Sequence, residues 1–274
     1  MSCAYCNGDV IQGPLGSYVI REVKGMGGQR VAYSALAGNV EVCIKCFNTP
    51  NLALAQHEKM VSDSVQRLRS RGDYGKLVAH VNPVQDVFQH RGDVFLVEPL
   101  RQGGSLAEQC GQALPVFTAA FIGRKLVRGI MALHLAGFIH RDIKPENILF
   151  GADAGELFVT DMSLAIAVYK QGLAAATPGY ASPQQLRNLA ASVADDVYSI
   201  GATLYQLIVG LRPFQCANPE EEVELTLDSS RPALPAAEFV KLPDMLNGLL
   251  CRALSKQPHE RPTLREMHEE LSRH

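Results

Sequence analysis

The sequence predicts an α+β chain folded as one domain of two lobes, a small β-rich N-lobe and a larger helical C-lobe. Strand-like stretches interrupted by glycine turns gather before residue 97, and helix-like stretches follow residue 105. The chain has 274 residues, which is near the upper size for a single hydrophobic core. We therefore expect one domain of two lobes rather than two independent domains.

The composition is that of an ordinary soluble globular chain, with 47% hydrophobic residues and a formal net charge of −2. This charge provides no strong field for nucleic acid or an anionic membrane, and the longest apolar run, near 200–211, is too short to span a bilayer. The first residues lack the basic and apolar regions of a signal peptide. The seven cysteines, an odd number, favour a reducing compartment over a disulfide framework. We expect a cytoplasmic protein with no nucleic-acid partner and no membrane span.

The local patterns predict the elements in order. Residues 1–16 contain a Cys-x-x-Cys pair, glycines and a proline without periodicity, which predicts an irregular lead-in. A helix is expected over 51–69, begun by Asn48 or Thr49 as its N-cap. A long, largely buried helix is expected over 116–136, with Phe117 among its buried positions. Helices over 245–254 and 263–271 are expected to close the chain.

One polar stretch, residues 140–147, lies between two apolar runs and carries the chemistry. It presents the carboxylate of Asp142, the ammonium of Lys144 and the carboxamide of Asn147 at fixed offsets. Such a set can accept a proton, hold a phosphate and ligate a metal, as phosphoryl transfer to a hydroxyl requires.

The stretch resembles the catalytic loop of eukaryotic-type (Hanks-type) protein serine/threonine kinases, including its Asp and the Asn five positions later. The resemblance implies a two-lobed protein-kinase fold over residues 17–271. The implied boundaries are an N-lobe over 17–97, a hinge over 98–104 and a C-lobe over 105–271.

A strand-like stretch, 42–45, resembles the Val-Ala-Ile-Lys strand of that family, and a glycine-rich turn precedes it. The resemblance implies that Lys45 contacts the α- and β-phosphates of ATP and that Cys43 lines the adenine pocket. Glu98-Pro99-Leu100 resembles the hinge, with Val97 guarding the back of the pocket. The implied nucleotide-binding residues are Gly25, Gly27, Gly28, Cys43, Lys45, Val97, Glu98 and Leu100.

The helix over 51–69 contains Glu58, the single glutamate between Glu41 and Glu98. The resemblance implies that Glu58 pairs with Lys45, although a solvated surface glutamate is the alternative. Two nearby residues depart from the family pattern. Arg30 stands where the third loop glycine is usual, and Ser62 stands where an apolar residue is usual.

Downstream of the loop, Asp161-Met162-Ser163 resembles the family's Asp-Phe-Gly. The resemblance implies that Asp161 and Asn147 ligate Mg²⁺, with Mn²⁺ as an alternative metal. The segment from Thr177 to Gln184 resembles the serine/threonine-kinase segment Thr-Pro-Gly-Tyr-x-Ala-Pro-Glu.

The segment from Thr177 to Gln184 extends the resemblance, together with the later residues Asp196 and Arg261. It implies that Thr177 hydrogen-bonds near Asp142, that Gln184 pairs with Arg261, and that Asp196 holds the backbone of the catalytic loop.

The resemblance implies ATP- and Mg²⁺-dependent transfer of the γ-phosphoryl group to serine or threonine hydroxyls of protein substrates. The implied catalytic residues are Lys45, Glu58, Asp142, Lys144 and Asn147. A pseudokinase that binds nucleotide or scaffolds partners is the alternative, because Arg30, Ser62, Met162 and Gln184 all depart from the pattern. A small-molecule kinase is a third option, against which the Thr177–Gln184 segment argues.

Two further expectations concern metal and regulation. Cys3 and Cys6 could share a zinc ion with Cys43 and Cys46, but residues three apart on a strand face opposite sides, so we expect no shared zinc site. Between residues 164 and 176 the single hydroxyl is that of Tyr169. We therefore expect the segment to be ordered by apolar packing or by a regulatory protein rather than by its phosphorylation.

Overall fold

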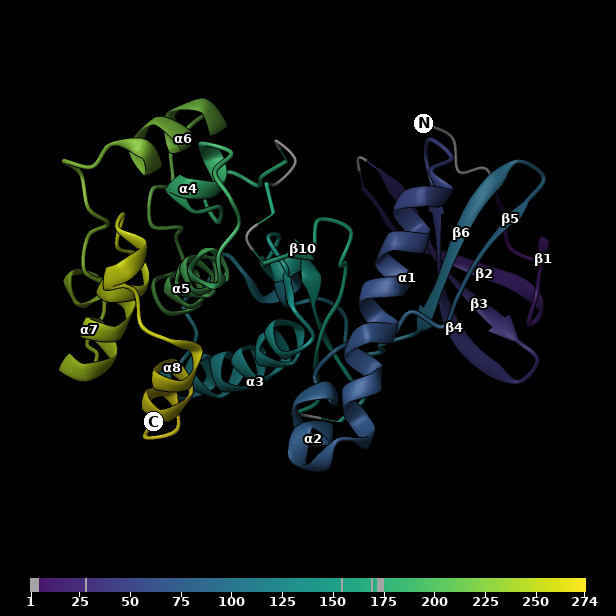
Figure 1. Cartoon of the computed structure of the whole chain (residues 1–274), viewed down its shortest axis with the longest axis horizontal. Coiled ribbons are helices and arrows are strands. Elements are labelled where there is room, and N and C mark those ends of the chain that lie inside the picture. The colour runs from purple at the N-terminus through teal and green to yellow at the C-terminus, as the bar shows by residue number, and fades with distance from the viewer. Residues whose placement is uncertain (1–4, 28, 154, 169, 172–174) are drawn as a thin grey trace. The chain divides into compact units, whose positions relative to one another are not determined.

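The computed structural model of the protein describes residues 5–27, 29–153, 155–168, 170, 171 and 175–274. The chain forms two compact units: unit 1 comprises residues 1–67 and 82–102, and unit 2 comprises residues 68–81 and 103–274. Unit 1 is rich in strands and unit 2 in helices (Figure 1), which confirms the predicted β-rich N-terminal region and helical C-terminal region.

Unit 1 is built on one antiparallel sheet with the strand order β1-β2-β3-β4-β6-β5. The strands are β1 (Val10–Gly13), β2 (Gly16–Met26), β3 (Arg30–Ala37), β4 (Val40–Phe47), β5 (Asp86–His90) and β6 (Asp93–Pro99). Alternation along these strands places β-branched and aromatic side chains in one core. Within it the rings of Tyr18 and Phe88 stack with centroids 5.5 Å apart, and Phe88 stacks on Phe95 at the same separation.

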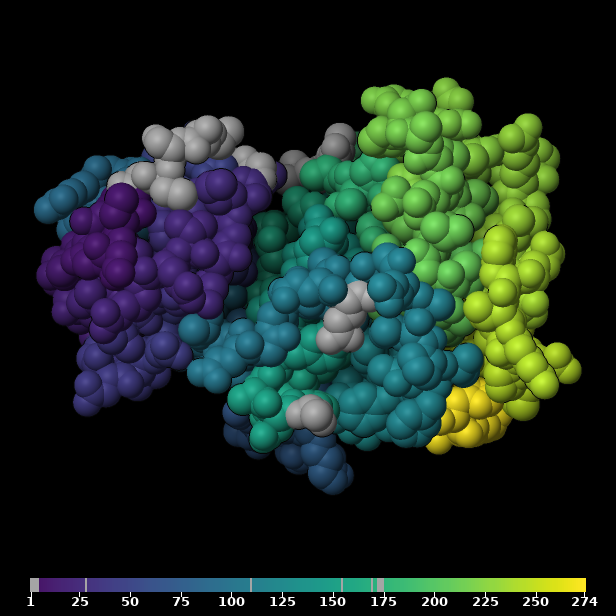
Figure 2. Space-filling view, turned by 180° about the vertical axis from the view of Figure 1, so that it is seen from behind, coloured from purple at the N-terminus to yellow at the C-terminus, as the bar shows by residue number. Residues whose placement is uncertain are grey.

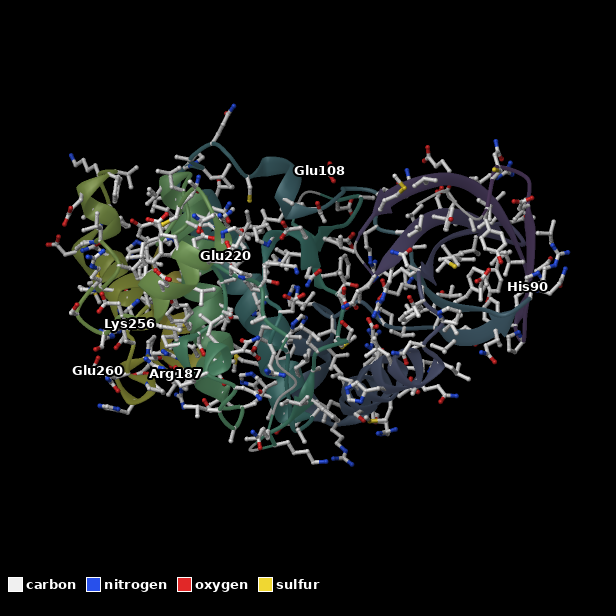
Figure 3. The ribbon with its side chains drawn as sticks, turned by 90° about the horizontal axis from the view of Figure 1, so that it is seen from above. His90, Glu108, Arg187, Glu220, Lys256 and Glu260 are labelled. Atoms are coloured by element: carbon white, nitrogen blue, oxygen red, sulfur yellow. The ribbon has the colours of Figure 1, made fainter. Side chains whose placement is uncertain are left out.

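The expected irregular lead-in over 1–16 is wrong for residues 10–13, which form β1 and pair with β2, and for Gly16, which begins β2. The short apolar pair Val10-Ile11 before a glycine–proline turn was the available signal, and Ile11 is fully buried. A Cβ on Gly13 would lie 2.7 Å from the Phe88 ring, so only glycine fits at the end of β1. The backbone N–H of Gln12 donates to Nδ1 of His90 at 3.4 Å, which ties β1 to the end of β5. His90 is labelled in Figure 3.

Helix α1 (Leu52–Gln66) confirms the helix predicted over 51–69, but its N-cap is Asn51 rather than Asn48 or Thr49. The Asn51 side chain accepts a hydrogen bond from the Leu54 amide at 3.0 Å, as an N-cap does. Later in the helix the buried hydroxyl of Ser62 accepts a hydrogen bond from the Val84 amide at 2.8 Å. The hydroxyl that departs from the family pattern therefore anchors α1 to the chain entering β5.

Unit 2 consists mainly of helices, with short strand pairs around the catalytic loop. Its helices are α2 (Gly75–Val78), α3 (Val116–Leu135), α4 (Pro183–Leu186), α5 (Val193–Val209), α6 (Pro219–Leu227), α7 (Asp244–Ala253) and α8 (Leu264–Leu271). Its strands are β7 (Phe138–Ile139), β8 (Ile148–Phe150), β9 (Leu157–Val159) and β10 (Ile166–Ala167). Single 3₁₀ turns are Arg67–Ser70, which crosses the boundary between the units, and Gly72–Tyr74, Leu106–Gln109, Pro145–Asn147, Ala236–Glu238 and Pro258–Glu260.

The predicted long helix is α3, and it packs against α5 and α8. A Cβ on Gly123 would lie 2.6 Å from a methyl group of Leu204, so a glycine lets α3 approach α5 closely. The expectation that Phe117 is buried is wrong, because 68% of this residue is exposed. Phe117 precedes the buried Leu126 by nine residues, or two and a half helical turns, and therefore points away from the core.

Two cationic side chains of unit 2 cap the C-terminal end of helix α6. Lys256 donates to the carbonyl oxygens of Leu225 and Thr226 at 2.8 and 2.9 Å, and Arg187 donates to that of Leu227 at 2.9 Å. These cations, labelled in Figure 3, satisfy carbonyl groups that a helix end leaves unpaired. Figure 2 shows the α7 and α8 residues, yellow-green to yellow, on the surface of unit 2. None of the helices in the described residues is long and apolar enough to span a membrane.

Candidate active site

The catalytic loop runs from His140 to Asn147 between β7 and β8, and buried Asp196 on helix α5 anchors its start. The Asp196 carboxylate accepts hydrogen bonds from the backbone N–H groups of His140 and Arg141, both at 2.9 Å. It also lies 2.7 Å from Nε2 of His134 on helix α3. This geometry confirms the predicted role of Asp196, while sequence reasoning missed His134.

The contact between Asp196 and the catalytic loop combines the buried charge of Asp196 with a strained backbone at Arg141. Burial alone would raise the pKa of Asp196, but the hydrogen bond and charge of His134 outweigh it and hold the pKa below its usual range. Arg141 has a φ of 67°, a left-handed conformation that costs a non-glycine residue about 1–2 kcal/mol. The two hydrogen bonds that Asp196 accepts from the loop therefore hold Arg141 in a conformation that a non-glycine residue disfavours.

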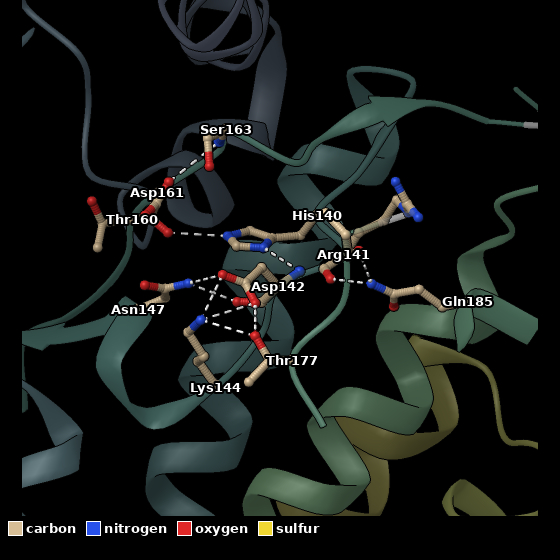
Figure 4. A network of polar contacts seen from close by, with 11 residues as sticks. His140, Arg141, Asp142, Lys144, Asn147, Thr160, Asp161, Ser163, Thr177 and Gln185 are labelled. Carbon is tan, nitrogen blue, oxygen red and sulfur yellow. Dashed lines mark hydrogen bonds and ion pairs between the residues drawn. The ribbon is translucent and has the colours of Figure 1, made fainter. Parts of the chain in front are cut away.

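The Asp142 carboxylate lies at the centre of the network in Figure 4. Its Oδ1 accepts the hydroxyl hydrogen of Thr177 at 2.6 Å, and its two oxygens lie 3.1 and 2.9 Å from Nζ of Lys144. Nδ2 of Asn147 donates to Oδ2 at 2.9 Å and to the Asp142 carbonyl oxygen at 2.8 Å. Lys144 also donates to Thr177 at 3.0 Å, which confirms the contacts predicted for Thr177.

Asp161 follows strand β9, which pairs with β8 at the end of the catalytic loop. The amide of Thr160 donates to the backbone oxygen of Asn147 at 3.0 Å, and His140 Nε2 lies 3.1 Å from the Thr160 carbonyl oxygen. These bonds fix the residue before Asp161 to the loop that carries Asn147. Met162, which stands where the family has phenylalanine, is fully buried and fills an apolar position.

The donor set in this unit fits a magnesium ion, which prefers oxygen ligands. The Nδ2 group of Asn147 is committed to Asp142, so the amide oxygen of Asn147 is the atom suited to a cation. Asp161 adds a carboxylate, and its backbone has a φ of 60°, a left-handed conformation that is uncommon for residues other than glycine.

The segment after Thr177 is fastened to the rest of unit 2 by side-chain amides. Gln184 accepts a hydrogen bond from Nη2 of Arg261 at 2.6 Å, which confirms the predicted pair. The neighbouring Gln185 donates to the Arg141 carbonyl oxygen at 2.7 Å, and so joins this segment directly to the catalytic loop. Burial lowers the pKa of Arg261 to about 10, so the guanidinium remains charged at neutral pH.

In unit 1, strand register decides which side chains share a face with Lys45. Cys43 lies opposite Glu98 and Lys45 opposite Leu96, and directly opposite residues in an antiparallel pair share a face. Val97 lies opposite Ile44 and is buried with it in the core of the sheet. Val97 therefore lies on the face opposite to that of Cys43 and Lys45, whereas Glu98 shares their face, and the role of Val97 at a nucleotide pocket stays a prediction.

The side chain of Glu98 is buried within β6 and pairs with Lys45 Nζ at 2.9 Å. Leu100 follows the end of β6 and is partly buried. Cys43 is partly buried, and burial raises the pKa of its thiol to about 11. The thiol is therefore protonated at neutral pH and serves as a small apolar group.

The glycine-rich turn joins β2 to β3. Gly25 lies at the end of β2 opposite Ala32, beside an irregularity in the strand register. The amide of Gly27 donates to the Arg30 carbonyl oxygen at 2.8 Å, which closes the turn. Gly28 lies outside the described residues.

Glu58 is fully buried in the middle of α1, which excludes the alternative of a solvated surface glutamate. Its carboxylate lies 2.8 Å from Nη2 of Arg30, the residue at the third-glycine position. Lys45 pairs with Glu98 at 2.9 Å, and the pairing of Lys45 with Glu58 that the resemblance implies stays a prediction. Neither Arg30 nor Glu98 was predicted as a partner, because burial of two such charges side by side leaves no signal in a single sequence.

The region of the second Cys-x-x-Cys pair is strand β4, as predicted, with Cys43 and Cys46 on opposite faces. Across the described residues, no group of three or more His, Cys, Asp or Glu side chains could hold a metal ion. Cys3 lies outside those residues, so the absence of a shared zinc site stays a prediction. Tyr169 also lies outside them.

Comparisons with known proteins agree with this geometry. The family model described as protein kinase domain matches residues 18–271. Serine/threonine-protein kinase PknL of Mycobacterium tuberculosis is 33% identical over 174 residues, which cover 61% of this chain and 43% of that protein. Serine/threonine-protein kinase PknK of Mycobacterium bovis is 29% identical over 250 residues, covering 85% of this chain and 22% of that protein.

A plant protein, the calcium and calcium/calmodulin-dependent serine/threonine-protein kinase of rice, is 30% identical over 191 residues, covering 67% of this chain and 37% of that protein. The matched region is thus less than half the length of each of these curated relatives. The family match nevertheless covers nearly all of this chain, and the loop geometry agrees with it. The chain therefore belongs to the protein kinase family, as a Hanks-type catalytic domain.

Proposed function

We propose that this protein transfers the γ-phosphoryl group of ATP to serine or threonine hydroxyls of protein substrates, with Mg²⁺ or Mn²⁺ as the metal. The observation that carries the proposal is the Asp142 carboxylate, which receives hydrogen bonds from an ammonium, a hydroxyl and a carboxamide in one network. That network positions an acceptor for a hydroxyl proton beside a cation for the transferred phosphoryl group. The names of the similar kinases support the same class of reaction.

In this mechanism Asp142 orients the substrate hydroxyl and accepts its proton. Lys144 is 21% exposed in its side chain and neutralises phosphoryl charge, while its bond to Thr177 keeps the ammonium beside the acceptor. The bound metal would neutralise phosphate charge, with Asn147 and Asp161 as its protein ligands. Most of the rate comes from positioning and charge stabilisation, because phosphoryl transfer needs little covalent chemistry from the protein.

Residues of the glycine-rich turn and of strand β4 in unit 1, and Lys144 in unit 2, complete the proposal. The family resemblance assigns the ATP phosphates to Lys45 and to the glycine-rich turn, where Gly25 and Gly27 have no side chains that would obstruct a phosphate. Specificity for serine and threonine is supported by Lys144, which stands two residues after Asp142 and binds Thr177.

The test is phosphoryl transfer from labelled ATP with Mg²⁺ to a generic basic protein, followed by phosphoamino-acid analysis. We expect phosphoserine and phosphothreonine, and a fall of several orders of magnitude in Asp142→Asn with no loss of fold, because the hydroxyl loses its proton acceptor. Glu146→Gln, an exposed neighbour in the same loop, is the matched control and should keep its rate. Unchanged transfer by Asp142→Asn would remove Asp142 from the mechanism.

A further inference from the structure

Helix α5 carries a second buried carboxylate in its first turn, Asp195, beside the loop anchor Asp196. Asp195 is 1% exposed and is the third residue of the helix. Its Oδ1 accepts the hydroxyl hydrogen of Ser182 at 2.6 Å, and its Oδ2 accepts the amide of Ser192 at 2.8 Å. A carboxylate buried in this way is costly unless hydrogen bonds and opposite charges offset its desolvation.

The hydroxyl of Ser182 connects this carboxylate to helix α4. Ser182 is fully buried and is the N-cap of α4, where its oxygen accepts the Gln185 amide at 3.1 Å. Because the hydroxyl donates to Asp195, the lone pairs of its oxygen are left for that amide. The side chain of Gln185 in turn donates to the Arg141 carbonyl oxygen at 2.7 Å (Figure 4). Hydrogen bonds thus run from α5 through the start of α4 to the residue before Asp142.

The start of α5 also contacts a buried guanidinium. Arg261 is 7% exposed, and its Nη1 donates at 2.8 Å to the carbonyl oxygen of Ala194, the residue before Asp195. Its Nη2 donates to Oε1 of Gln184 at 2.6 Å. Gln184 stands where the family segment has glutamate, and its neutral amide accepts this hydrogen bond without supplying a charge. The guanidinium therefore needs a negative charge from another residue.

Electrostatic interactions identify Asp195 as the source of that charge. Burial lowers the pKa of Arg261 to about 10, and the charge of Asp195 is the largest influence that opposes this fall. Burial also lowers the pKa of Arg141, and the charge of Asp195 again opposes it most. Burial raises the pKa of Asp195 itself, while its hydrogen bonds and the charge of Arg261 oppose the rise. The ionised carboxylate is therefore costly by itself, and these interactions offset part of the cost.

We propose that Asp195 is a positioning residue that holds the segment 177–185 in place through Ser182. The same carboxylate supplies the negative charge that the buried guanidinium of Arg261 requires. The segment also carries Thr177, whose hydroxyl donates to the proposed proton acceptor, so its position affects where a substrate hydroxyl can lie. The structural part of this proposal stands on the hydrogen bonds and buried charges alone, and its effect on protein substrates rests on the proposed function.

Thermal unfolding of the nucleotide-free protein tests the hydrogen bond by a double-mutant cycle. Ser182→Ala removes the hydroxyl, and Asp195→Asn removes the charge while keeping the shape of the side chain. A hydrogen bond to a charged acceptor is roughly twice as strong as one to a neutral acceptor. We therefore expect Ser182→Ala to lower Tm by clearly less in the Asp195→Asn background than in the wild type. An equal loss in both backgrounds would overturn the proposed role of Ser182.

A carboxylate placed at position 184 tests the source of the charge. Gln184→Glu adds a second negative charge near Arg261 in the wild type, whereas in Asp195→Asn it replaces the one that was removed. The change in Tm that Gln184→Glu causes should therefore be more favourable in Asp195→Asn than in the wild type, by roughly 3 °C or more. Glu266→Gln, at the third residue of helix α8 and exposed, is the matched control background, in which Gln184→Glu should have its wild-type effect. Equal changes in Asp195→Asn and in the wild type would overturn the proposal that Asp195 supplies this charge.

Steady-state kinetics well below Tm test the effect on protein substrates in a way that a loss of stability would not reproduce. Asp195→Asn and Ser182→Ala should each raise the KM for the generic basic protein by roughly threefold or more, and change the KM for ATP by less than about twofold. A variant that is merely unstable would lose active protein, which lowers the maximal rate and leaves both KM values unchanged. An unchanged KM for the protein substrate in either variant would refute the positioning role. An inactive wild-type protein would refute the proposed function instead, and the two unfolding experiments would still decide the structural part.

Discussion

Replacing Asp196 by asparagine should release the start of the catalytic loop. The substitution keeps the size of the side chain and one acceptor oxygen, but it puts an N–H₂ group where the second carboxylate oxygen stood. That oxygen accepts the His140 amide at 2.9 Å and lies 2.7 Å from His134 Nε2. Either the His140 or the Arg141 amide must then lose its acceptor inside the protein, where Asp196 is fully buried.

The size of the effect follows from the bonds lost. Each hydrogen bond to a charged acceptor contributes roughly 1.5–3 kcal/mol. Removing one partner of a buried charged pair costs about 3–5 kcal/mol in proteins, and the left-handed Arg141 backbone adds to the tendency of the loop to relax. We expect a loss of about 3–5 kcal/mol in the free energy of unfolding and a fall in Tm of about 6–15 °C.

The assays are thermal unfolding and amide hydrogen exchange read by mass spectrometry on the peptide that contains residues 140 and 141. Exchange at these two amides should accelerate, because a released amide is no longer protected. Asp73→Asn, at an exposed aspartate, is the matched control and should leave both measurements unchanged. Unaltered exchange in the loop peptide together with a Tm within about 1 °C of wild type would refute the reasoning.

The pH dependence of the same variant gives an independent check. The pKa of Asp196 is lower in the folded protein than its usual value, so the carboxylate contributes stability above the usual carboxyl range near pH 4. That contribution is lost as the pH falls through the lower, folded-state pKa. The difference in stability between wild type and Asp196→Asn should therefore be largest near neutral pH and shrink below about pH 4.

Three further predictions concern metal and thiol chemistry. Stabilisation by ATP should require Mg²⁺ or Mn²⁺ and should shrink in Asp161→Ala, and equal metal-independent shifts of Tm in both proteins would contradict the metal role of Asp161. At pH 8, iodoacetamide should label exposed Cys6 long before Cys43, whose raised pKa of about 11 keeps its thiol protonated; peptide mass spectrometry showing equal rates would count against this. Elemental analysis should find no stoichiometric zinc, and one zinc per chain that is lost on mutating Cys3 and Cys6 would overturn the strand argument.

The contiguous part of the site could be predicted from the sequence because its chemistry lies within a few residues. Asp142, Lys144 and Asn147 share one loop, and the structure brings them into one network. Thr177 and Asp196 join the loop from distant segments, and the resemblance placed both of them correctly.

The features that could not be predicted from the sequence are the face of a strand or helix on which a side chain lies and the partner that it contacts. Val97 shares a face of the sheet with Ile44, and Glu98 shares the other face with Cys43, because neighbouring residues of a strand point to opposite sides. Strand β1 was missed because two apolar residues before a turn are a weak signal, although pairing with β2 makes Ile11 part of the core. The error at Phe117 is of the same kind, since helical periodicity identified the helix but the first turn was assigned to the wrong face.

The position of Glu98 shows how a motif and a physical rule can disagree over one residue. By resemblance, Glu98 belongs to a hinge and contributes only its backbone. By physical chemistry, a fully buried carboxylate must have partners, and the structure gives it Lys45 and Asn82. Period-two alternation then places both Glu98 and Lys45 on the face that Cys43 occupies. The departure at Arg30 follows the same rule, because a guanidinium buried at the third-glycine position needs a carboxylate, and Glu58 is the carboxylate that it meets. The face of the strand and the distance to the nearest carboxylate thus account for the pairs of Lys45 with Glu98 and of Arg30 with Glu58, and the spacing along the chain alone did not predict either pair.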